Sequence, residues 1–323
     1  MKRLKHITRF FGRVAPELGG NGLFASLDEL IEQRQYVAYL RQLGQSKTFS
    51  SMAGDVKSAF KGRGMELEEI RSYTYGDDVR DIDWRVTARK EQPFTKLYAE
   101  ERDREIYALL DLSPQMVFGT RHELKSVAAA KIAALLGWMS LENKDRFGCL
   151  VFDGAESLVF DGAESLFFKP QNNRANMMVM LKKISETTRK ILRGTAEKNS
   201  FAKALQLLQQ NIKSQASVFV ISDFSAFDDE VKKMLAALSR KARVYVLNVF
   251  DVLEELPPPA GEYMAENAGE RVIFDSRSKY FQKEYKAYFK EKRRRIETFC
   301  RQFGIRCVEI RTDIPLHKQL RIG

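Results

Sequence analysis

Two aspartates each stand at the end of an apolar run of the kind that forms a buried strand. Asp111 lies at the end of one run, with Ser113 and Gln115 after it. Asp223 directly follows another run. In open α/β sheets, ligands bind beyond the carboxyl ends of the strands. A hard cation such as Mg2+ or Mn2+ takes oxygen ligands and keeps several waters, which leaves a position that an incoming carboxylate can fill. These residues therefore predict an ion site at one edge of a sheet.

A second group of polar residues fills residues 71–89, where four aspartates, four arginines and a tryptophan stand within nineteen residues. Asp and Arg suit fixed, bidentate geometry, and their equal numbers favour a self-neutralised network that locks a turn. Two other interpretations stay open. One is a metal-dependent phosphoesterase site, in which carboxylates converge on paired ions, built on Asp77, Asp78, Asp81 and Asp83. The other is a docking surface made by Arg71, Gly76, Asp77, Asp78, Arg80, Asp83, Trp84 and Arg89.

The local pattern of this segment predicts a turn followed by a short helix. Gly76 accepts positive φ, and aspartates bond their own backbone, so a turn is favoured in which Asp77 or Asp78 caps the helix. The apolar residues that follow fall on one helical stripe, although their alternation would also fit a strand. We expect Trp84 to be buried and a strand to follow at residues 94–99.

Length and composition describe a globular chain with a basic surplus. The 323 residues are 44% hydrophobic, which is enough for a full core in one large domain or two smaller ones. Lys and Arg outnumber Asp and Glu by 54 to 43, and the net charge is +11. This surplus favours anionic partners but does not choose among them.

Cysteine and histidine usage argues against several kinds of site. Cys149, Cys300 and Cys307 form no CxxC pair and leave an odd number, so neither a disulfide framework nor a zinc knuckle is expected. A reducing cytoplasm fits this usage best. The three histidines stand far apart, which argues against a histidine triad. Because the chain also has no phosphate loop, we predict that it is not an enzyme.

The sequence shows neither a secretory signal nor a membrane span. The most apolar run, residues 127–141, is too short to span a bilayer and carries Lys131, so it is predicted to be a buried helix. Residues 2–14 place apolar side chains on one helical face and basic ones on the rest. Such a segment either packs on its own domain or lies on an anionic membrane. The predicted location is cytoplasmic, with peripheral contact at the inner face of the membrane as the alternative.

The order of predicted elements divides the chain near residue 103. Residues 1–103 form a smaller N-terminal α+β region, in which a capping box at Ser26 opens a helix and residues 44–64 form a loop. In residues 104–323 apolar strands alternate with helices, which predicts a mostly parallel, doubly wound α/β sheet covered on both faces. Strands are predicted at residues 106–112, 147–152, 218–222, 244–250 and 304–310. Helices are predicted at residues 125–143, 174–186, 200–212, 228–239 and 278–303, with prolines 257–259 in a loop.

One internal repeat is identical in both copies: residues 150–157 recur unchanged at residues 158–165. An insertion of even length preserves which side chains face the core, and each copy carries an Asp-Gly turn dipeptide. The duplication can therefore add one strand to an antiparallel meander. Its alternative interpretation is a neutral duplication tolerated at a sheet edge.

Several segments together resemble one bacterial family. They are Gly62-Arg-Gly-Met-Glu, residues 71–89, Thr95-Lys-Leu-Tyr, Glu100-Glu-Arg, Phe118-Gly-Thr-Arg and Lys125-Ser-Val-Ala-Ala-Ala. They look like the family catalogued as domain of unknown function 58. Its members resemble von Willebrand factor type A domains in their C-terminal part, so the resemblance implies a sheet of that type. Family genes commonly neighbour those of MoxR-type AAA+ ATPases, which implies a shared role in protein maturation or metal insertion.

The type A resemblance also implies where an ion would bind. A type A domain uses an Asp-x-Ser-x-Ser motif, a Thr on a later loop and an Asp after a central strand. The residues that match this pattern are Asp111, Ser113 and Asp223, with Gln115 in place of the second Ser. The Thr position falls on Asn199 or Ser200 or, for a longer loop, on Thr195. The implied cofactor is Mg2+ or Mn2+ at a degenerate site. The alternative is a site that binds no ion, in which the Asp and Ser side chains only cap the strand ends.

The predicted function is a non-enzymatic adaptor. The resemblance implies MoxR-type AAA+ ATPases and other type A-domain proteins as its partners. An alternative is binding to nucleic acid or another anionic surface through the basic helix at residues 278–303. The aromatic residues of that helix are spaced for packing on a sheet, which makes nucleic acid the weaker expectation.

Overall fold

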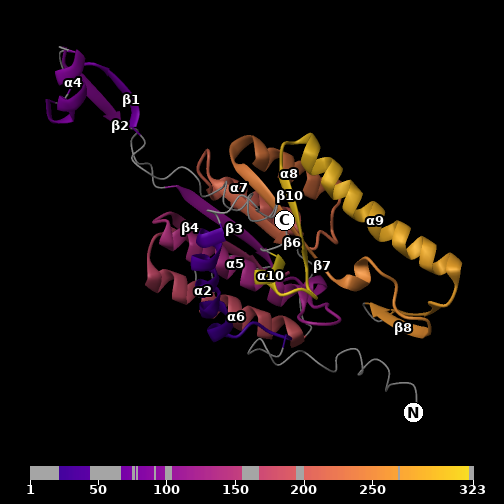
Figure 1. Cartoon of the computed structure of the whole chain (residues 1–323). Helices are drawn as coiled ribbons and strands as arrows, with labels where there is room; N and C mark the ends of the chain where they lie inside the picture. The colour runs from indigo at the N-terminus through magenta and orange to yellow at the C-terminus, as the bar shows by residue number, and fades with distance from the viewer. Residues whose placement is uncertain are drawn as a thin grey trace.

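A computed structural model describes most of the chain (Figure 1). The described residues are 22–43, 67–74, 77, 79–90, 92–98, 104–154, 167–193, 200–267 and 270–319. Several predictions lie outside them, namely those for residues 2–14 and 44–64, for Gly76, Asp78, Thr195 and Asn199, and for the second copy of the repeat.

The main sheet has six strands. They are β3 (Glu105–Asp111), β4 (Arg146–Phe152), β5 (Phe167–Gln171), β6 (Ser217–Ser222), β7 (Arg243–Phe250) and β10 (Arg306–Arg311). Their order is β10-β7-β6-β3-β4-β5, and every neighbouring pair is parallel except β4 with β5. The predicted mostly parallel sheet is confirmed, and each of its predicted strands is present.

Helices cover both faces of this sheet. One group is α2 (Leu27–Leu43), α5 (Lys125–Glu142) and α6 (Arg174–Lys190), and the other is α7 (Phe201–Asn211), α8 (Asp229–Lys241) and α9 (Lys279–Gln302). Successive side chains of a strand point to opposite faces. Accordingly Leu110 of β3 belongs to the core under α2, α5 and α6, whereas Leu109 belongs to the core under α7, α8 and α9. The sheet is therefore doubly wound, as predicted.

The strand order creates a switch point between β3 and β6, which are adjacent and parallel. From β3 the chain continues to β4 on one side, and β6 and β7 extend the sheet on the other side. Loops that leave the carboxyl ends of β3 and β6 therefore diverge in opposite directions. In open α/β sheets this divergence forms the crevice where ligands bind.

The buried helix α5 carries a charge that its neighbours neutralise. Lys131 Nζ lies 2.6 Å from Glu123 Oε2 and 3.4 Å from Glu29 Oε1, and all three side chains are buried. Glu29 belongs to the predicted capping box of α2, which is confirmed by its reciprocal hydrogen bonds with Ser26. The cap that begins α2 thus also supplies a counter-ion to α5.

Residues 67–98 form a small unit that contains the Asp- and Arg-rich segment. Strands β1 (Leu67–Ser72) and β2 (Phe94–Tyr98) are antiparallel, and between them lie the 3-10 helix η2 (Val79–Asp81) and helix α4 (Trp84–Lys90). The predicted short helix and following strand are confirmed. Asp83 caps the helix instead of Asp77, because its Oδ1 accepts the amides of Arg85 and Val86.

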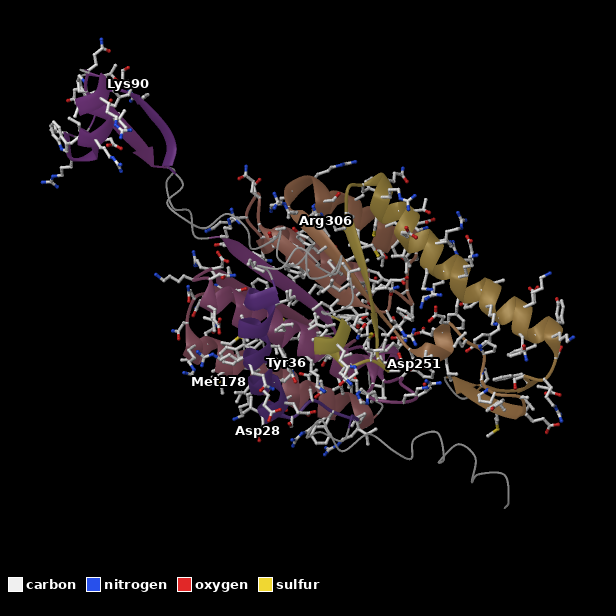
Figure 2. The ribbon with its side chains drawn as sticks, viewed as in Figure 1. Asp28, Tyr36, Lys90, Met178, Asp251 and Arg306 are labelled. Carbon is white, nitrogen blue, oxygen red and sulfur yellow. The ribbon has the colours of Figure 1, made fainter. Side chains whose placement is uncertain are left out.

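The prediction that Trp84 is buried is wrong. Its side chain is 67% exposed, and Val79 is 57% exposed. The physical reason is that α4 has only seven residues and no buried position. Figure 2 shows the side chains of this unit, with Lys90 labelled, pointing outward around it.

Helix α9 packs on more than the sheet. Ile296 and Cys300 in its C-terminal half are buried in the sheet core. Its N-terminal half instead contacts a hairpin of β8 (Glu262–Asn267) and β9 (Glu270–Asp275), which the sequence did not predict. Phe274 of the hairpin stacks on Phe281 of α9 with ring centroids 4.9 Å apart. Phe281 therefore packs on this hairpin and Phe299 packs against the sheet core, whereas Tyr280 and Tyr288 are exposed, so the predicted packing is confirmed only in part.

Shorter elements complete the described structure. They are the 3-10 helices η3 (Pro114–Met116), η4 (Ile191–Arg193) and η5 (Val252–Glu254), and α10 (Leu316–Gln319). Gly154 has a φ of 81°, which suits the Asp-Gly turn predicted in the first copy of the repeat. The strand that the second copy would add stays a prediction. Among the described residues, no helix has the length and apolarity needed to cross a membrane.

Candidate functional site at the carboxyl edge of the sheet

Asp111 and Ser222 join the two strands of the switch point. Asp111 ends β3, and its Oδ2 accepts the Ser222 hydroxyl at 2.6 Å. Its Oδ1 accepts the amide of Ser113 at 2.9 Å. The Ser222 hydroxyl in turn accepts the amide of Phe224 at 3.0 Å. Asp111 and Ser222 are 4% and 2% exposed, so this polar link lies within the protein.

The electrostatic surroundings of Asp111 favour its protonated form. Burial and the neighbouring charge of Asp223 raise the pKa of Asp111 to about 6, against the opposing effect of hydrogen bonds from Ser222 and Ser113. A carboxyl with a pKa of about 6 is still protonated in roughly a tenth of the molecules at pH 7. Asp111 therefore differs from an ordinary surface aspartate.

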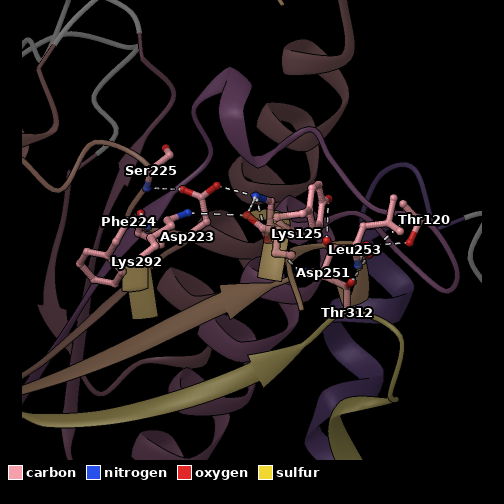
Figure 3. Close-up of polar contacts among 12 residues, drawn as sticks. Thr120, Lys125, Asp223, Phe224, Ser225, Asp251, Leu253, Lys292 and Thr312 are labelled. Carbon is pink, nitrogen blue, oxygen red and sulfur yellow. Dashed lines mark hydrogen bonds and ion pairs between the residues drawn. The ribbon is translucent and has the colours of Figure 1, made fainter. Parts of the chain in front are cut away.

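Lys125 forms the centre of a chain of alternating charges beside this link (Figure 3). Its Nζ lies 2.5 Å from Asp223 Oδ2 and 3.4 Å from both carboxylate oxygens of Glu254. Glu254 Oε1 is also 3.6 Å from Lys292 of α9. The Lys125 and Asp223 side chains are only 4% and 2% exposed. We call these four residues, Asp223, Lys125, Glu254 and Lys292, the charge chain.

The pKa shifts keep the Lys125–Asp223 pair ionised. Burial alone would lower the pKa of Lys125, but the charges of Asp223 and Glu254 raise it above its ordinary value. Burial alone would likewise raise the pKa of Asp223, but Lys125 and Lys292 hold it below its ordinary value. Opposite charges at close range favour the charged form of each partner. The pair is therefore a buried ion pair at neutral pH.

Asp251 fixes the position of Glu254. It is 0% exposed, and its carboxylate accepts four hydrogen bonds, from the amide and hydroxyl of Thr120, the amide of Leu253 and the hydroxyl of Thr312. Glu254 accepts the Asp251 amide at 2.9 Å and completes a capping box for η5. Asp251 thus ties three loops together at this edge (Figure 3). Its capping box holds Glu254 toward Lys125.

The structure brings together only part of the predicted ion site. Asp111, Ser113 and Asp223 lie at the same edge, as predicted. Gln115 is exposed within η3. Ser200 caps α7 by accepting the amide of Ala202. Sequence reasoning missed Lys125, Asp251 and Glu254 as members of the site. The Asp-x-x-Glu capping box that begins at Asp251, directly after an apolar run, is the signal that could have indicated two of them.

The residues at this edge do not fit a divalent cation as they are arranged. Both oxygens of Asp111 already accept hydrogen bonds. Asp223 Oδ1 accepts the amide of Ser225, and its Oδ2 contacts Lys125. Among the residues that the structure describes, no group of three or more His, Cys, Asp or Glu side chains is placed to hold a metal. A metal ion that binds to Asp223 would therefore have to displace the Lys125 ammonium group.

The Asp- and Arg-rich segment has part of its predicted self-neutralised network. Arg71 Nη2 lies 2.7 Å from Asp77 Oδ1, and Asp77 also accepts the amide of Thr74. The Thr74 amide and the Arg71 guanidinium lower the pKa of Asp77 below its ordinary value. Asp77 and Asp83 are thus committed to a turn and a helix cap. The side chains of Asp78 and Asp81 are not among those that the structure describes. The two aspartates that are described, Asp77 and Asp83, give no support to the phosphoesterase alternative.

The surface of this segment agrees with a docking role. Arg80, Trp84 and Arg89 are exposed, and Arg71 is partly exposed. Trp and Arg are the residues that most often dominate binding energy at protein interfaces. The docking surface itself stays a prediction.

Comparison with known proteins assigns the chain to a family. Residues 69–295 match the family described as "Protein of unknown function DUF58", which is more than half of the 323-residue chain. Uncharacterized protein Rv1480 of Mycobacterium tuberculosis and uncharacterized protein Mb1516 of Mycobacterium bovis are each 25% identical to it over 246 residues, which cover 75% of this chain and 74% of theirs. No solved structure has significant similarity to the chain. On the extent of the family match, this protein belongs to the DUF58 family.

Proposed function

We propose that this protein is a non-enzymatic adaptor whose sheet domain is of the von Willebrand factor type A type. Its partners on this proposal are a MoxR-type AAA+ ATPase and other type A-domain proteins, in protein maturation or metal insertion. The single observation that carries the proposal is the placement of Asp111 and Asp223 at the switch point, where the type A resemblance expects them. The proposed domains are residues 1–103 and 104–323.

The state of the charged side chains supports an adaptor over an enzyme. A catalytic acid, base or nucleophile must reach its substrate. Lys125 and Asp223 are buried and paired with each other, and Asp111 is bonded to Ser222 and Ser113. Groups held in this way stabilise the strand ends and position the loops between them. The proposed location is the cytoplasm.

The proposed contact surface for the ATPase is the exposed side of the small unit around Trp84. Trp84 is 67% exposed, and an accessible tryptophan is one of the residue types that most often dominate binding energy at protein interfaces. The exposed Arg80 and Arg89 lie in the same unit and can pair with carboxylates of a partner. This pairing of an apolar anchor with arginines fits a protein surface that offers a pocket beside acidic groups.

Co-purification tests this proposal. Tagged protein is isolated from its own cells, and any AAA+ ATPase retained with it is identified by mass spectrometry. We expect Trp84→Ala to lose the ATPase. Tyr280→Ala is the matched control, because Tyr280 is 74% exposed on α9 and is expected to have no role in the contact. Retention of the ATPase by Trp84→Ala, or no ATPase with any form of the chain, would contradict the proposal.

A second candidate function is binding to an anionic surface through α9. Lys279, Lys283, Lys286 and Lys290 are all exposed and make no ion pair with any described residue. Their spacing of four, three and four residues places them on one flank of the helix, over about 16 Å of its axis. A row of unpaired ammonium groups favours phosphate groups of a lipid surface or a nucleic acid.

Charge-matched variants test this second function. Lys283→Gln with Lys290→Gln removes two charges from the lysine row. Arg294→Gln with Arg301→Gln removes two charges that are already paired with Glu291 and Glu297 on the same helix. Binding to phosphatidylglycerol vesicles or duplex DNA at low salt should fall with the first pair and change little with the second. Equal losses, or no binding at low salt, would exclude the lysine row as a site.

A further inference from the structure

We propose that Lys125 supplies the cation of the switch-point site, so that its ammonium group takes the place of the divalent ion implied by the type A resemblance. The protein then binds neither Mg2+ nor Mn2+ at Asp223. On the proposed adaptor function, it follows that the contacts of the protein with its partners are independent of metal; this consequence rests on that function. The assignment of Lys125 itself rests only on the geometry of the site.

The Lys125 ammonium group has a complete set of neighbours. An ammonium group donates three hydrogen bonds. Three carboxylate oxygens surround it, Asp223 Oδ2 at 2.5 Å and the two oxygens of Glu254 at 3.4 Å. The ring of Phe118, whose centroid is 5.4 Å away, offers its negative face to the same charge. The group is therefore held as a bound cation would be, between fixed anionic ligands and an aromatic wall.

The place of Lys125 in the fold needs these ligands. Lys125 is the first residue of α5, and its amide donates to Phe118 O at 2.8 Å. The amino end of a helix is the positive end of its dipole and disfavours a cation. Burial disfavours a charged ammonium further. Asp223 and Glu254 together outweigh both effects, since the pKa of Lys125 is raised.

The same geometry leaves no room for a hydrated divalent ion. Mg2+ requires near-octahedral oxygen ligands at about 2.0–2.1 Å and usually keeps several waters. The Asp223 oxygen that would bind it is in contact with the buried Lys125 ammonium. Two cations on one oxygen would repel each other across a site that water does not screen.

The charge chain also connects the Lys125 ammonium group to α9, a connection that a free ion would not have. Lys125 is covalently part of α5, and Glu254 connects it to Lys292 of α9. Tyr285 of α9 adds a hydrogen bond to the carbonyl of Leu253 in η5 at 2.7 Å. The switch point is therefore linked to α9 by ionic and hydrogen-bonded contacts that do not depend on the metal content of the solution.

Metal titration of the purified full chain tests the proposal without any partner. Binding of Mn2+ is followed by electron paramagnetic resonance and calorimetry in the wild type, in Lys125→Met and in the double variant Lys125→Met/Asp223→Asn. We expect no stoichiometric binding to the wild type. Lys125→Met, which removes the charged end and keeps an unbranched side chain one atom shorter, should gain one site at millimolar Mn2+ or below. The double variant should lose that site again.

Two outcomes would overturn the proposal. One is stoichiometric Mn2+ binding to the wild type that Asp223→Asn abolishes. The other is a folded Lys125→Met variant that gains no Mn2+ site, because Lys125 would then be an ordinary buried ion pair. If Lys125→Met does not fold, Mn2+ binding to the wild type and to Lys125→Arg, which keeps a cation, decides the question. No Mn2+ site in either protein supports the proposal, and a site in either protein overturns it. Failure to co-purify an ATPase would affect only the adaptor proposal.

Discussion

Lys125 Nζ and Asp223 Oδ2 are 2.5 Å apart although 98 residues separate them in the sequence. The contact joins the first residue of α5 to the residue that follows β6. Both side chains are almost fully buried, so water does not compete with the pair. Removing either partner would leave an uncompensated charge in the interior.

Removing one partner of this pair should destabilise the fold more than removing both. We expect Asp223→Asn to cost about 3–5 kcal/mol in the free energy of unfolding, since Lys125 is left buried with an incomplete set of ligands. The double variant Lys125→Met/Asp223→Leu should recover most of that loss. Denaturant unfolding measures both. Asp229→Asn is the matched control, because Asp229 pairs with Lys232 at 2.7 Å but is 99% exposed, and little change is expected.

Additive losses would contradict this expectation. If the double variant were as unstable as the sum of its single variants, the two side chains would act independently, and the buried pair would not be the source of the effect.

The elements of the main sheet were predictable because their signals are local. Residues 106–110 at the centre of β3 are all apolar, as expected for a strand buried on both faces, and all seven residues of the strand are buried. The start of α2 was predictable because Ser26 and Glu29 are three residues apart and bond each other directly. Caps and periodicity are set by neighbours in the sequence, so they can be identified without the fold.

The composition of the site was less predictable because its contacts are long-range. Asp111 and Asp223 follow strands, and a strand-end position can be identified from the sequence. Lys125 gave no such signal, because its partners Asp223 and Glu254 are 98 and 129 residues away. The exposure of Trp84 was mispredicted for the same reason, since burial depends on which other elements pack on α4, and none of the described residues covers it.

Asp251 should be more important for stability than its conventional role as a cap implies. Asp251→Ala would leave the hydroxyl of Thr312 and the amide and hydroxyl of Thr120 without their acceptor, and a buried unsatisfied donor costs about 1–3 kcal/mol. We therefore expect a loss of several kcal/mol in denaturant unfolding. Asp275→Ala is a suitable comparison, because Asp275 bonds Arg277 at the surface and should change stability little. Similar losses for both variants would show that the hydrogen bonds to Asp251 stabilise the fold no more than a surface ion pair does.

The two tryptophans should respond differently to a quencher in solution. Trp84 is 67% exposed, whereas Trp138 is 1% exposed and donates from Nε1 to Leu30 O at 2.9 Å. Trp84→Phe should remove the fraction of fluorescence that acrylamide quenches readily and leave stability within about 0.5 kcal/mol of the wild type. Trp138→Phe should keep the quenchable fraction and destabilise the fold by about 1–3 kcal/mol, because the Leu30 carbonyl loses its donor. Protection of Trp84 from acrylamide in the isolated protein would contradict its exposure.

The pKa of Asp111 predicts how stability changes with pH. Its pKa is about 6 in the folded protein, against an ordinary value of 3.8. The folded state therefore binds more protons than the unfolded state between these values, and the stability that Asp111 contributes is complete below pH 3.8 and is lost as pH rises through 6. A difference of this size corresponds to about 3 kcal/mol. The side chain of Asp111→Asn cannot titrate. The free energy of unfolding of this variant, relative to that of the wild type, should therefore rise by up to about 3 kcal/mol as the pH increases from 4 to 7. Denaturant unfolding at each pH measures the difference, and curves that stay parallel across this range would show that Asp111 does not have a raised pKa.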